Sequence, residues 1–283
     1  MGEVRALAAL AGVLVLAGCA GLGGPGALKP GAGYVALGSS FAAGAGIGPT
    51  RAGTPARCGR TENNYPALLA ARLGLILDDQ SCGGATTAHV TGPWNELPPQ
   101  IDAVNARTRL VTVTIGGNDL NYVGNLFMSA CDPAKPFKVQ GHTLPCTGPI
   151  LPSEADYARV EASLRAIAAG VKARAPRARL VFVQYVTLTP DRACPAANLP
   201  EERAAPMREL GGRLAQITAR VAADAKAKVL SADVLSRGHS PCDPEPWANG
   251  MPPDRDTSQG APWHPNARGH AVISEALAAM LSS

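Results

Sequence analysis

Gly38-Ser39-Ser40-Phe41-Ala42-Ala43-Gly44 follows directly on the apolar run Tyr34-Val35-Ala36-Leu37. The apolar run is bounded by glycine and predicts a short buried strand. A serine just beyond the carboxyl end of such a strand lies where open α/β sheets bind their ligands. If Ser40 begins a helix, its backbone N–H can also face a developing negative charge. Taken alone, the stretch is more typical of a helix N-cap, and the motifs that follow it decide between the two interpretations.

The composition indicates a globular chain. Of its 283 residues, 46% are hydrophobic and 17% are charged, which is ample for a sizeable core. The net charge is a small +4 and aromatic residues make up 4%, so we expect no nucleic-acid partner. No cysteine or histidine spacing is typical of a zinc site, and we expect neither a metal nor a cofactor.

The N-terminus indicates export. An apolar run over residues 6–17 follows Arg5 and is too short to span a bilayer, so residues 1–19 are interpreted as a signal peptide. The run ends in Leu16-Ala17-Gly18-Cys19, which resembles a bacterial lipoprotein box with Cys19 as the lipidated residue. We therefore expect an anchor on the outer face of the cell membrane and a Gly/Pro-rich tether over residues 20–33. The alternative is an ordinary secretory signal, with Cys19 incidental.

Six cysteines follow Cys19, an even number that favours disulfides in an exported chain. Sequence alone allows about 15 pairings. We expect nearest neighbours to pair, because this closes short loops: Cys58 with Cys82, Cys131 with Cys146, and Cys194 with Cys242.

Strand and helix patterns alternate over residues 34–283, which we interpret as one domain. Further strands are predicted at residues 75–77, 110–115, 180–185 and 229–232. Helices are predicted at residues 64–73, 154–174, 207–226 and 267–281. This alternation predicts a parallel sheet with helices on both faces.

Three further groups stand at the ends of these elements. Gly84 lies in the small-residue loop Cys82-Gly83-Gly84-Ala85-Thr86, and Asn118 follows the strongest strand in Gly116-Gly117-Asn118-Asp119. His264 directly precedes Pro265 at the start of the last helix, which holds it rigidly. Each block also has a plainer interpretation as turn or cap chemistry. We expect the other histidines, at positions 89, 142, 239 and 270, to be structural or solvated.

Taken in order from Tyr34 to the C-terminus, the four blocks resemble the SGNH, or GDSL-like, hydrolases, and in particular their secreted actinobacterial esterase and lipase branch. The resemblance implies a three-layer α/β/α sandwich of flavodoxin-like type. It implies that Ser40 is the nucleophile and His264 its general base. The oxyanion donors would be the Ser40 N–H, the Gly84 N–H and the Asn118 side-chain amide.

Two positions depart from the family pattern. Ser39 and Ala261 stand where the family usually has aspartate. Without that second carboxylate, either the Ala261 carbonyl accepts the His264 Nδ1–H, or Asp254 or Asp256 supplies the charge. We expect the Ala261 carbonyl, because a carbonyl fixes the same ring orientation and tautomer.

The resemblance implies a serine hydrolase that cleaves carboxylic acyl esters through an acyl-Ser40 intermediate. With the N-terminal signal, we expect it to be exported, and we expect a monomer. The alternatives are a polysaccharide O-acetyl esterase, an acyltransferase, or a non-catalytic surface lipoprotein that has lost the activity. The first two share the same site and differ in the acyl donor or acceptor.

Overall fold

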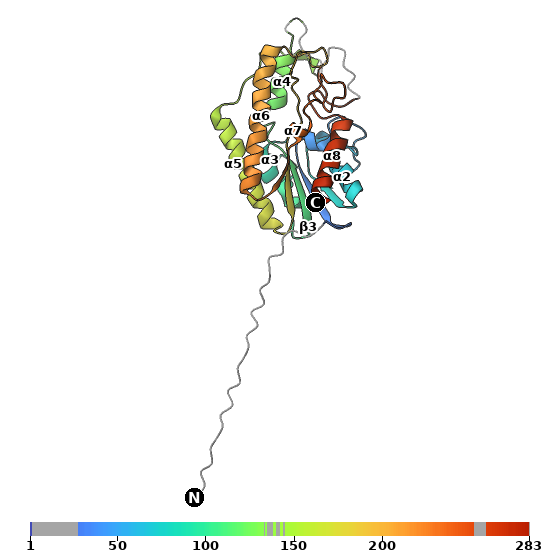
Figure 1. The fold of residues 1–283 in the computed structure, drawn as a ribbon, viewed down its shortest axis with the longest axis vertical. Helices are drawn as coiled ribbons and strands as arrows, with labels where there is room; N and C mark the ends of the chain where they lie inside the picture. Colours follow the sequence, from blue (N-terminus) through green and yellow to red (C-terminus); the bar gives the residue numbers. More distant parts are fainter. Residues whose placement is uncertain are drawn as a thin grey trace.

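In the computed structural model, five parallel strands form the central sheet (Figure 1). They are β1 (Gly33–Gly38), β2 (Ile76–Asp79), β3 (Thr108–Thr114), β6 (Arg179–Val183) and β7 (Lys228–Leu230). The strand order is β2-β1-β3-β6-β7, with Val35 beside Val111 and Val111 beside Leu180. This order is flavodoxin-like, and the direction of chain progression reverses between β1 and β3. The predicted fold class is confirmed.

Two groups of helices cover the sheet (Figure 1). On one side, α2 (Tyr65–Leu73) packs against α8 (Ala267–Ser282). On the other, α6 (Glu201–Asp224) packs against α4 (Tyr122–Ala130) and α5 (Glu154–Arg174), and α5 also contacts α3 (Thr87–Thr91). The short elements are α1 (Ser40–Ala43), α7 (Ala232–Leu235), the 3₁₀ turns Ala56–Cys58 and Gln100–Ala103, and the pair β4 (Lys138–Val139) and β5 (His142–Thr143).

The structure describes residue 1 and residues 28–132, 134, 138–139, 142–143, 145–251 and 259–282. Cys19, residues 20–27 of the predicted tether, Asp254, Asp256 and the side chain of His142 lie outside these residues. Among the described helices, none has both the length and the apolar character needed to cross a bilayer.

Local capping chemistry explains where the predicted helices begin and end. The Asn64 side chain accepts the Ala67 N–H at the start of α2, and Gly74 ends that helix with a φ of 64°. The bounds of α5 are those predicted.

The predicted start of α6 at Met207 is wrong, because this helix begins at Glu201 and contains Pro206. Proline removes one backbone hydrogen bond, which is tolerable so close to an exposed helix start. Glu201 and Glu202 favour that start, because acidic side chains interact well with a helix N-terminus. The short helix α3 and the nine-residue α4 were not predicted.

The three predicted disulfides are confirmed: Cys58–Cys82, Cys131–Cys146 and Cys194–Cys242. All six cysteines lie outside the five strands of the central sheet, so each bridge ties together segments that the sheet hydrogen bonds do not join. A bridge of this kind typically stabilises a domain by about 2–4 kcal/mol.

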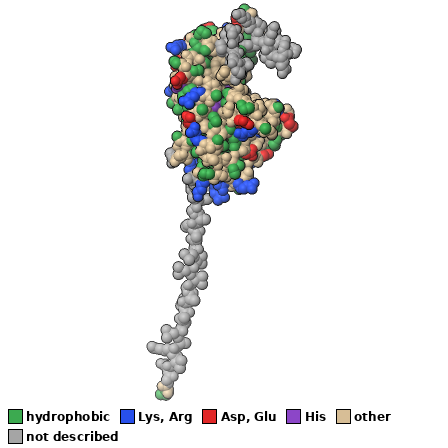
Figure 2. All heavy atoms as spheres, turned by 90° about the vertical axis from the view of Figure 1, so that its right-hand side faces the viewer, with side chains coloured by type: hydrophobic (Ala, Val, Ile, Leu, Met, Phe, Trp, Pro, Cys, Tyr) green, Lys and Arg blue, Asp and Glu red, His purple; other side chains and the backbone are tan. Residues whose placement is uncertain are grey.

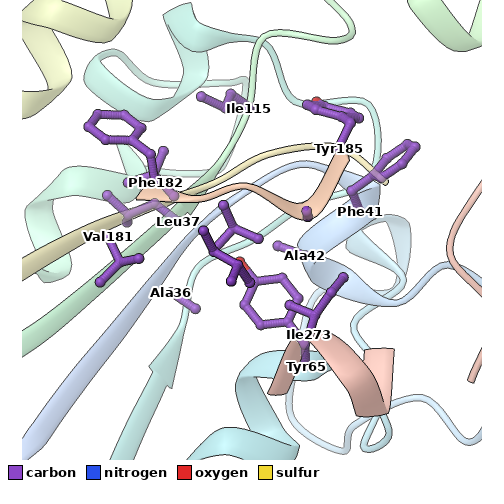
Figure 3. Close-up of a cluster of buried hydrophobic side chains, with 14 of the residues drawn as sticks. Ala36, Leu37, Phe41, Ala42, Tyr65, Ile115, Val181, Phe182, Tyr185 and Ile273 are labelled. Atoms are coloured by element: carbon purple, nitrogen blue, oxygen red, sulfur yellow. The ribbon is translucent and has the colours of Figure 1, made fainter. Parts of the chain in front are cut away.

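A continuous apolar core fills the space between sheet and helices (Figure 3). Leu37 on β1 is fully buried, as are Phe182 on β6 and Tyr65 on α2. Phe41 and Tyr185 extend this core to the carboxyl edge of the sheet, where their ring centroids are 4.3 Å apart. The core thus includes Leu37 before Ser40 and Phe41 directly after it.

One buried histidine belongs to this packing. His270 on α8 is fully buried and accepts the Tyr65 backbone N–H at 3.0 Å through Nδ1. Burial lowers its pKa to about 3, with a smaller contribution from His264. The folded protein therefore holds this imidazole in its neutral form.

This burial predicts a loss of stability in acid. Below about pH 6.5 His270 is protonated in the unfolded chain. In the folded chain it stays neutral until the pH falls to its folded-state pKa of about 3. The free energy of unfolding should fall by about 1.4 kcal/mol per pH unit in that window from this group. Urea unfolding near pH 7 and pH 4 measures it. The His270→Gln variant keeps an acceptor for Tyr65 and should lose less stability over this interval than the wild type. An equal loss in both proteins would contradict the assignment.

Candidate active site

Ser40 and His264 meet at the carboxyl edge of the sheet, although 224 positions separate them in the chain. The Ser40 Oγ lies 2.7 Å from the His264 Nε2, and both side chains are nearly buried. Both residues are site candidates in the sequence, and the structure brings them together.

Ser40 is positioned by the end of β1. A Cβ on Gly38 would lie 2.6 Å from the Thr114 carbonyl oxygen, so the turn from β1 into α1 requires glycine. The Gln100 side chain holds this turn from both sides, since it accepts the Gly38 N–H at 2.8 Å and donates to the Gly38 carbonyl at 3.0 Å. This role of Gln100 was not predicted, because nothing in the surrounding sequence indicates it.

His264 is held by a loop that is bound to other loops through the backbone. The Ala261 N–H donates to the Ala45 carbonyl just after α1, which ties the loop to the Ser40 segment. Asn249 accepts the Trp263 N–H and donates its own N–H to the His264 carbonyl. Trp263 itself is fully buried, with a φ of 54°. These contacts fix the imidazole beside Ser40.

The His264 Nδ1 lies 2.6 Å from the Pro262 carbonyl oxygen. A carbonyl can only accept, so Nδ1 carries the proton in this contact and Nε2 is left with a lone pair toward Ser40. This is the tautomer that a general base for serine needs.

The expected role of Ala261 is wrong at the residue level. The carbonyl that contacts the His264 Nδ1 is that of Pro262, whereas the Ala261 carbonyl accepts the Asn249 side-chain amide at 3.2 Å. Trp263, between Pro262 and His264, has a positive φ, and the Pro262 carbonyl lies against the imidazole. Asp254 and Asp256, the alternative partners, lie outside the described residues.

Gly84 and Asn118 follow the strands on either side of β1. Gly84 follows β2 and Asn118 follows β3, so both segments come to the edge where Ser40 lies. The Asn118 side-chain amide donates to the Ala85 carbonyl at 2.8 Å, which joins the two loops. Within the described part of the chain, the Ser40 and Gly84 backbone N–H groups make no hydrogen bond. These two donors are therefore available to a ligand.

Tyr185 links the segment before Ser40 to the segment before Asn118 through its hydroxyl. Its hydroxyl accepts the Gly117 N–H at 2.9 Å and lies 3.4 Å from the Ser39 Oγ. Burial raises its pKa to about 12, so it stays a neutral donor and acceptor. This role of Tyr185 was not predicted from the sequence. The available signal was its place at the end of the predicted strand over residues 180–185.

A stack of three flat side chains packs against the Gly84 loop. The Trp94 ring lies between the His89 imidazole, 4.1 Å away, and the Arg57 guanidinium, also 4.1 Å away. The Trp94 edge would lie 3.4 Å from a Cβ on Gly84. Together with the neighbouring Cys58–Cys82 bridge, this stack fixes the loop. His89, like His239 stacked on Trp247, is structural as expected.

Among the described residues, no group of three His, Cys, Asp or Glu side chains is arranged to hold a metal ion. The described residues of the site are a serine, a histidine and a set of backbone and amide donors.

Comparison with known proteins agrees with this geometry. Residues 36–272 match the profile of the GDSL-like lipase/acylhydrolase family. Lipase 2 of Streptomyces coelicolor is 34% identical over 252 residues, which cover 86% of this chain and 83% of that protein. The chain also matches two crystal structures at 25% identity. Phospholipase A1 of Streptomyces albidoflavus has a TM-score of 0.69, with 89% of this chain and 100% of that one covered. The extracellular lipase of Streptomyces rimosus has a TM-score of 0.67, with 88% and 99% covered.

The profile match spans most of the chain, from β1 to α8, and includes all four sequence blocks. This chain belongs to the GDSL-like lipase/acylhydrolase family.

Proposed function

We propose that this protein is an exported serine esterase or lipase that hydrolyses carboxylic acyl esters through an acyl-Ser40 intermediate. The observation that carries the proposal is the 2.7 Å contact between the Ser40 Oγ and the His264 Nε2. Family membership supports it, as do relatives named as lipases and an esterase.

In the first step, the His264 Nε2 takes the Ser40 hydroxyl proton while Oγ attacks the ester carbonyl. The Pro262 carbonyl, 2.6 Å from Nδ1, keeps the ring in the tautomer that this transfer requires and stabilises the imidazolium that forms. The imidazolium then gives its proton to the leaving alkoxide. The products of this half-reaction are the free alcohol and the acyl-enzyme.

The negative charge on the tetrahedral oxygen needs donors that are in place beforehand. The Ser40 and Gly84 N–H groups make no bond within the described chain, and the Asn118 amide has a second hydrogen beyond the one it gives to Ala85. We assign these three groups to the oxyanion hole. In the second half-reaction, His264 deprotonates a water that attacks the acyl carbonyl. The bond between the acyl carbon and Oγ then breaks, the imidazolium returns its proton to the Ser40 Oγ, and the carboxylic acid leaves.

The disulfides and the N-terminal sequence support the proposed location. Three disulfides form and persist in an oxidising compartment, which fits an exported protein. We infer that Cys19 is lipidated and anchors the domain to the outer face of the cell membrane through the segment over residues 20–33.

Replacement of the nucleophile tests the proposal directly. The Ser40→Ala variant should lose hydrolysis of a short p-nitrophenyl ester and should no longer be labelled by a fluorophosphonate, because the attacking hydroxyl is gone. Mass spectrometry locates the label in the wild type. Ser39→Ala is the matched control, since it removes the adjacent hydroxyl and should leave labelling in place. Labelling that persists in Ser40→Ala, or a label on another residue, would refute the assignment.

The effect of Asn118 on kcat, as distinct from KM, tests its assignment to the oxyanion hole. Asn118→Ala should lower kcat by roughly 10²–10³ while KM changes little, because the amide is needed when charge develops on the oxygen. Steady-state kinetics on the same ester separate the two constants, and thermal unfolding shows whether the loops remain packed. A raised KM at unchanged kcat would assign Asn118 to substrate binding instead.

A further inference from the structure

Basic residues gather at the amino edge of the sheet, opposite Ser40. The segments that enter four of the five strands each carry an exposed cation: Lys29 before β1, Arg107 before β3, Arg177 before β6 and Lys226 before β7. Figure 2 shows Lys and Arg side chains grouped at the lower end of the domain. The parallel sheet collects these charges on one face, because all its strands begin at the same edge.

A groove of about 800 Å³ crosses this face beside the starts of β1, β2 and β3. Lys29, Arg107, Arg109 and Arg177 line it, and we call it the basic groove. Ile76, also in the lining, is 68% exposed. The groove therefore combines positive charge with an exposed aliphatic side chain.

Four cations and one carboxylate, that of Asp78, line the basic groove, so its charge is positive on balance. Lys29, Arg107 and Arg177 have no acidic partner within the described chain, and Arg109 donates to the backbone carbonyls of Ala106 and Thr108. Asp78, an acidic residue in the lining, accepts from the Gln80 side chain.

Helix electrostatics do not account for the groove. Lys172 and Arg174 lie in the last turn of α5, where the helix dipole favours cations. Lys29, Arg107 and Arg177 lie in loops outside any helix. On the outer helices, by contrast, Arg213 pairs with Glu154 and Arg220 with Glu161.

The position of the groove along the chain points to its partner. Lys29 is ten residues beyond Cys19, and ten extended residues span at most about 35 Å. An acyl anchor at Cys19 would thus keep the basic groove close to the bilayer.

We propose that the basic groove binds a bilayer surface that carries anionic headgroups, with Ile76 inserted among them. Lys and Arg near such a surface are attracted by its negative potential, and the guanidinium fork also matches phosphate oxygens. The domain then sits on its amino edge, with Ser40 and His264 on the edge away from the membrane. Orientation relative to the cell surface rests on the proposed anchor at Cys19, whereas binding by the groove does not.

Vesicle binding tests the proposal with the full chain carrying Cys19→Ala, so that no acyl chain contributes. The probes are vesicles of phosphatidylcholine alone and of phosphatidylcholine mixed with phosphatidylglycerol. Binding should be stronger to the mixed vesicles and should weaken as salt is added. Binding to phosphatidylcholine alone measures any contribution of the apolar N-terminal residues.

Variants then assign the binding to the groove. Arg107→Gln with Arg177→Gln should weaken binding to the mixed vesicles roughly 30-fold, and Arg107→Glu with Arg177→Glu should weaken it further. The matched control is Arg192→Glu with Arg237→Glu, which makes the same charge change at exposed sites on the carboxyl edge. This control should bind as the parent does.

Hydrolysis of a soluble p-nitrophenyl ester should be unchanged in the groove variants, which also verifies their fold. Ser40→Ala should bind vesicles as the parent does, so failure of the catalytic proposal and failure of the membrane proposal are distinguishable. Equal binding to both vesicle types, or equal losses in the groove and control variants, would overturn the membrane proposal.

Discussion

The parallel pairing of β1 with β2 on one side and β3 on the other is the constraint on which this molecule depends. Because the three strands point the same way, the residues that follow them arrive at one edge: Ser40, Gly84 and Asn118. The same geometry sends the segments before the strands to the opposite edge, where the cations collect. The parallel direction of the strands thus places the candidate active site and the basic groove at opposite edges of the sheet.

Among the described residues, the candidate site is built from backbone groups more than from charged side chains. The His264 imidazole contacts a carbonyl, its loop is tied to Ala45 and Asn249 by peptide hydrogen bonds, and two of the oxyanion donors are peptide N–H groups. Peptide groups in a packed loop are fixed before a substrate arrives and need no reorganisation as charge develops. The rings of Phe41 and Tyr185 supply the packing that keeps these loops in place.

The loops at the carboxyl edge are long and irregular, and covalent and aromatic contacts restrain them. Cys58–Cys82 and the stack of Arg57, Trp94 and His89 hold the Gly84 segment, while Cys194–Cys242 joins two loops beyond β6 and β7. A sheet of five strands cannot order such loops through burial alone. Export makes disulfides available for this purpose.

The sequence by itself determined the alternation of strands and helices, because strand periodicity and helix caps are short-range properties. The resemblance of four short blocks to the SGNH hydrolases added the three-layer sandwich and Ser40, His264, Gly84 and Asn118 as site candidates. The disulfide pairing remained a nearest-neighbour expectation until the structure showed the three bridges. The sequence placed the start of α6 at Met207, since Pro206 looks like a helix boundary when its exposed first turn is unknown. Only the tertiary structure decided that the Pro262 carbonyl contacts His264, that Tyr185 and Gln100 support the serine turn, and that the scattered cations share one groove. Those relations depend on loop torsions and on contacts between distant segments, which no local pattern of residues encodes.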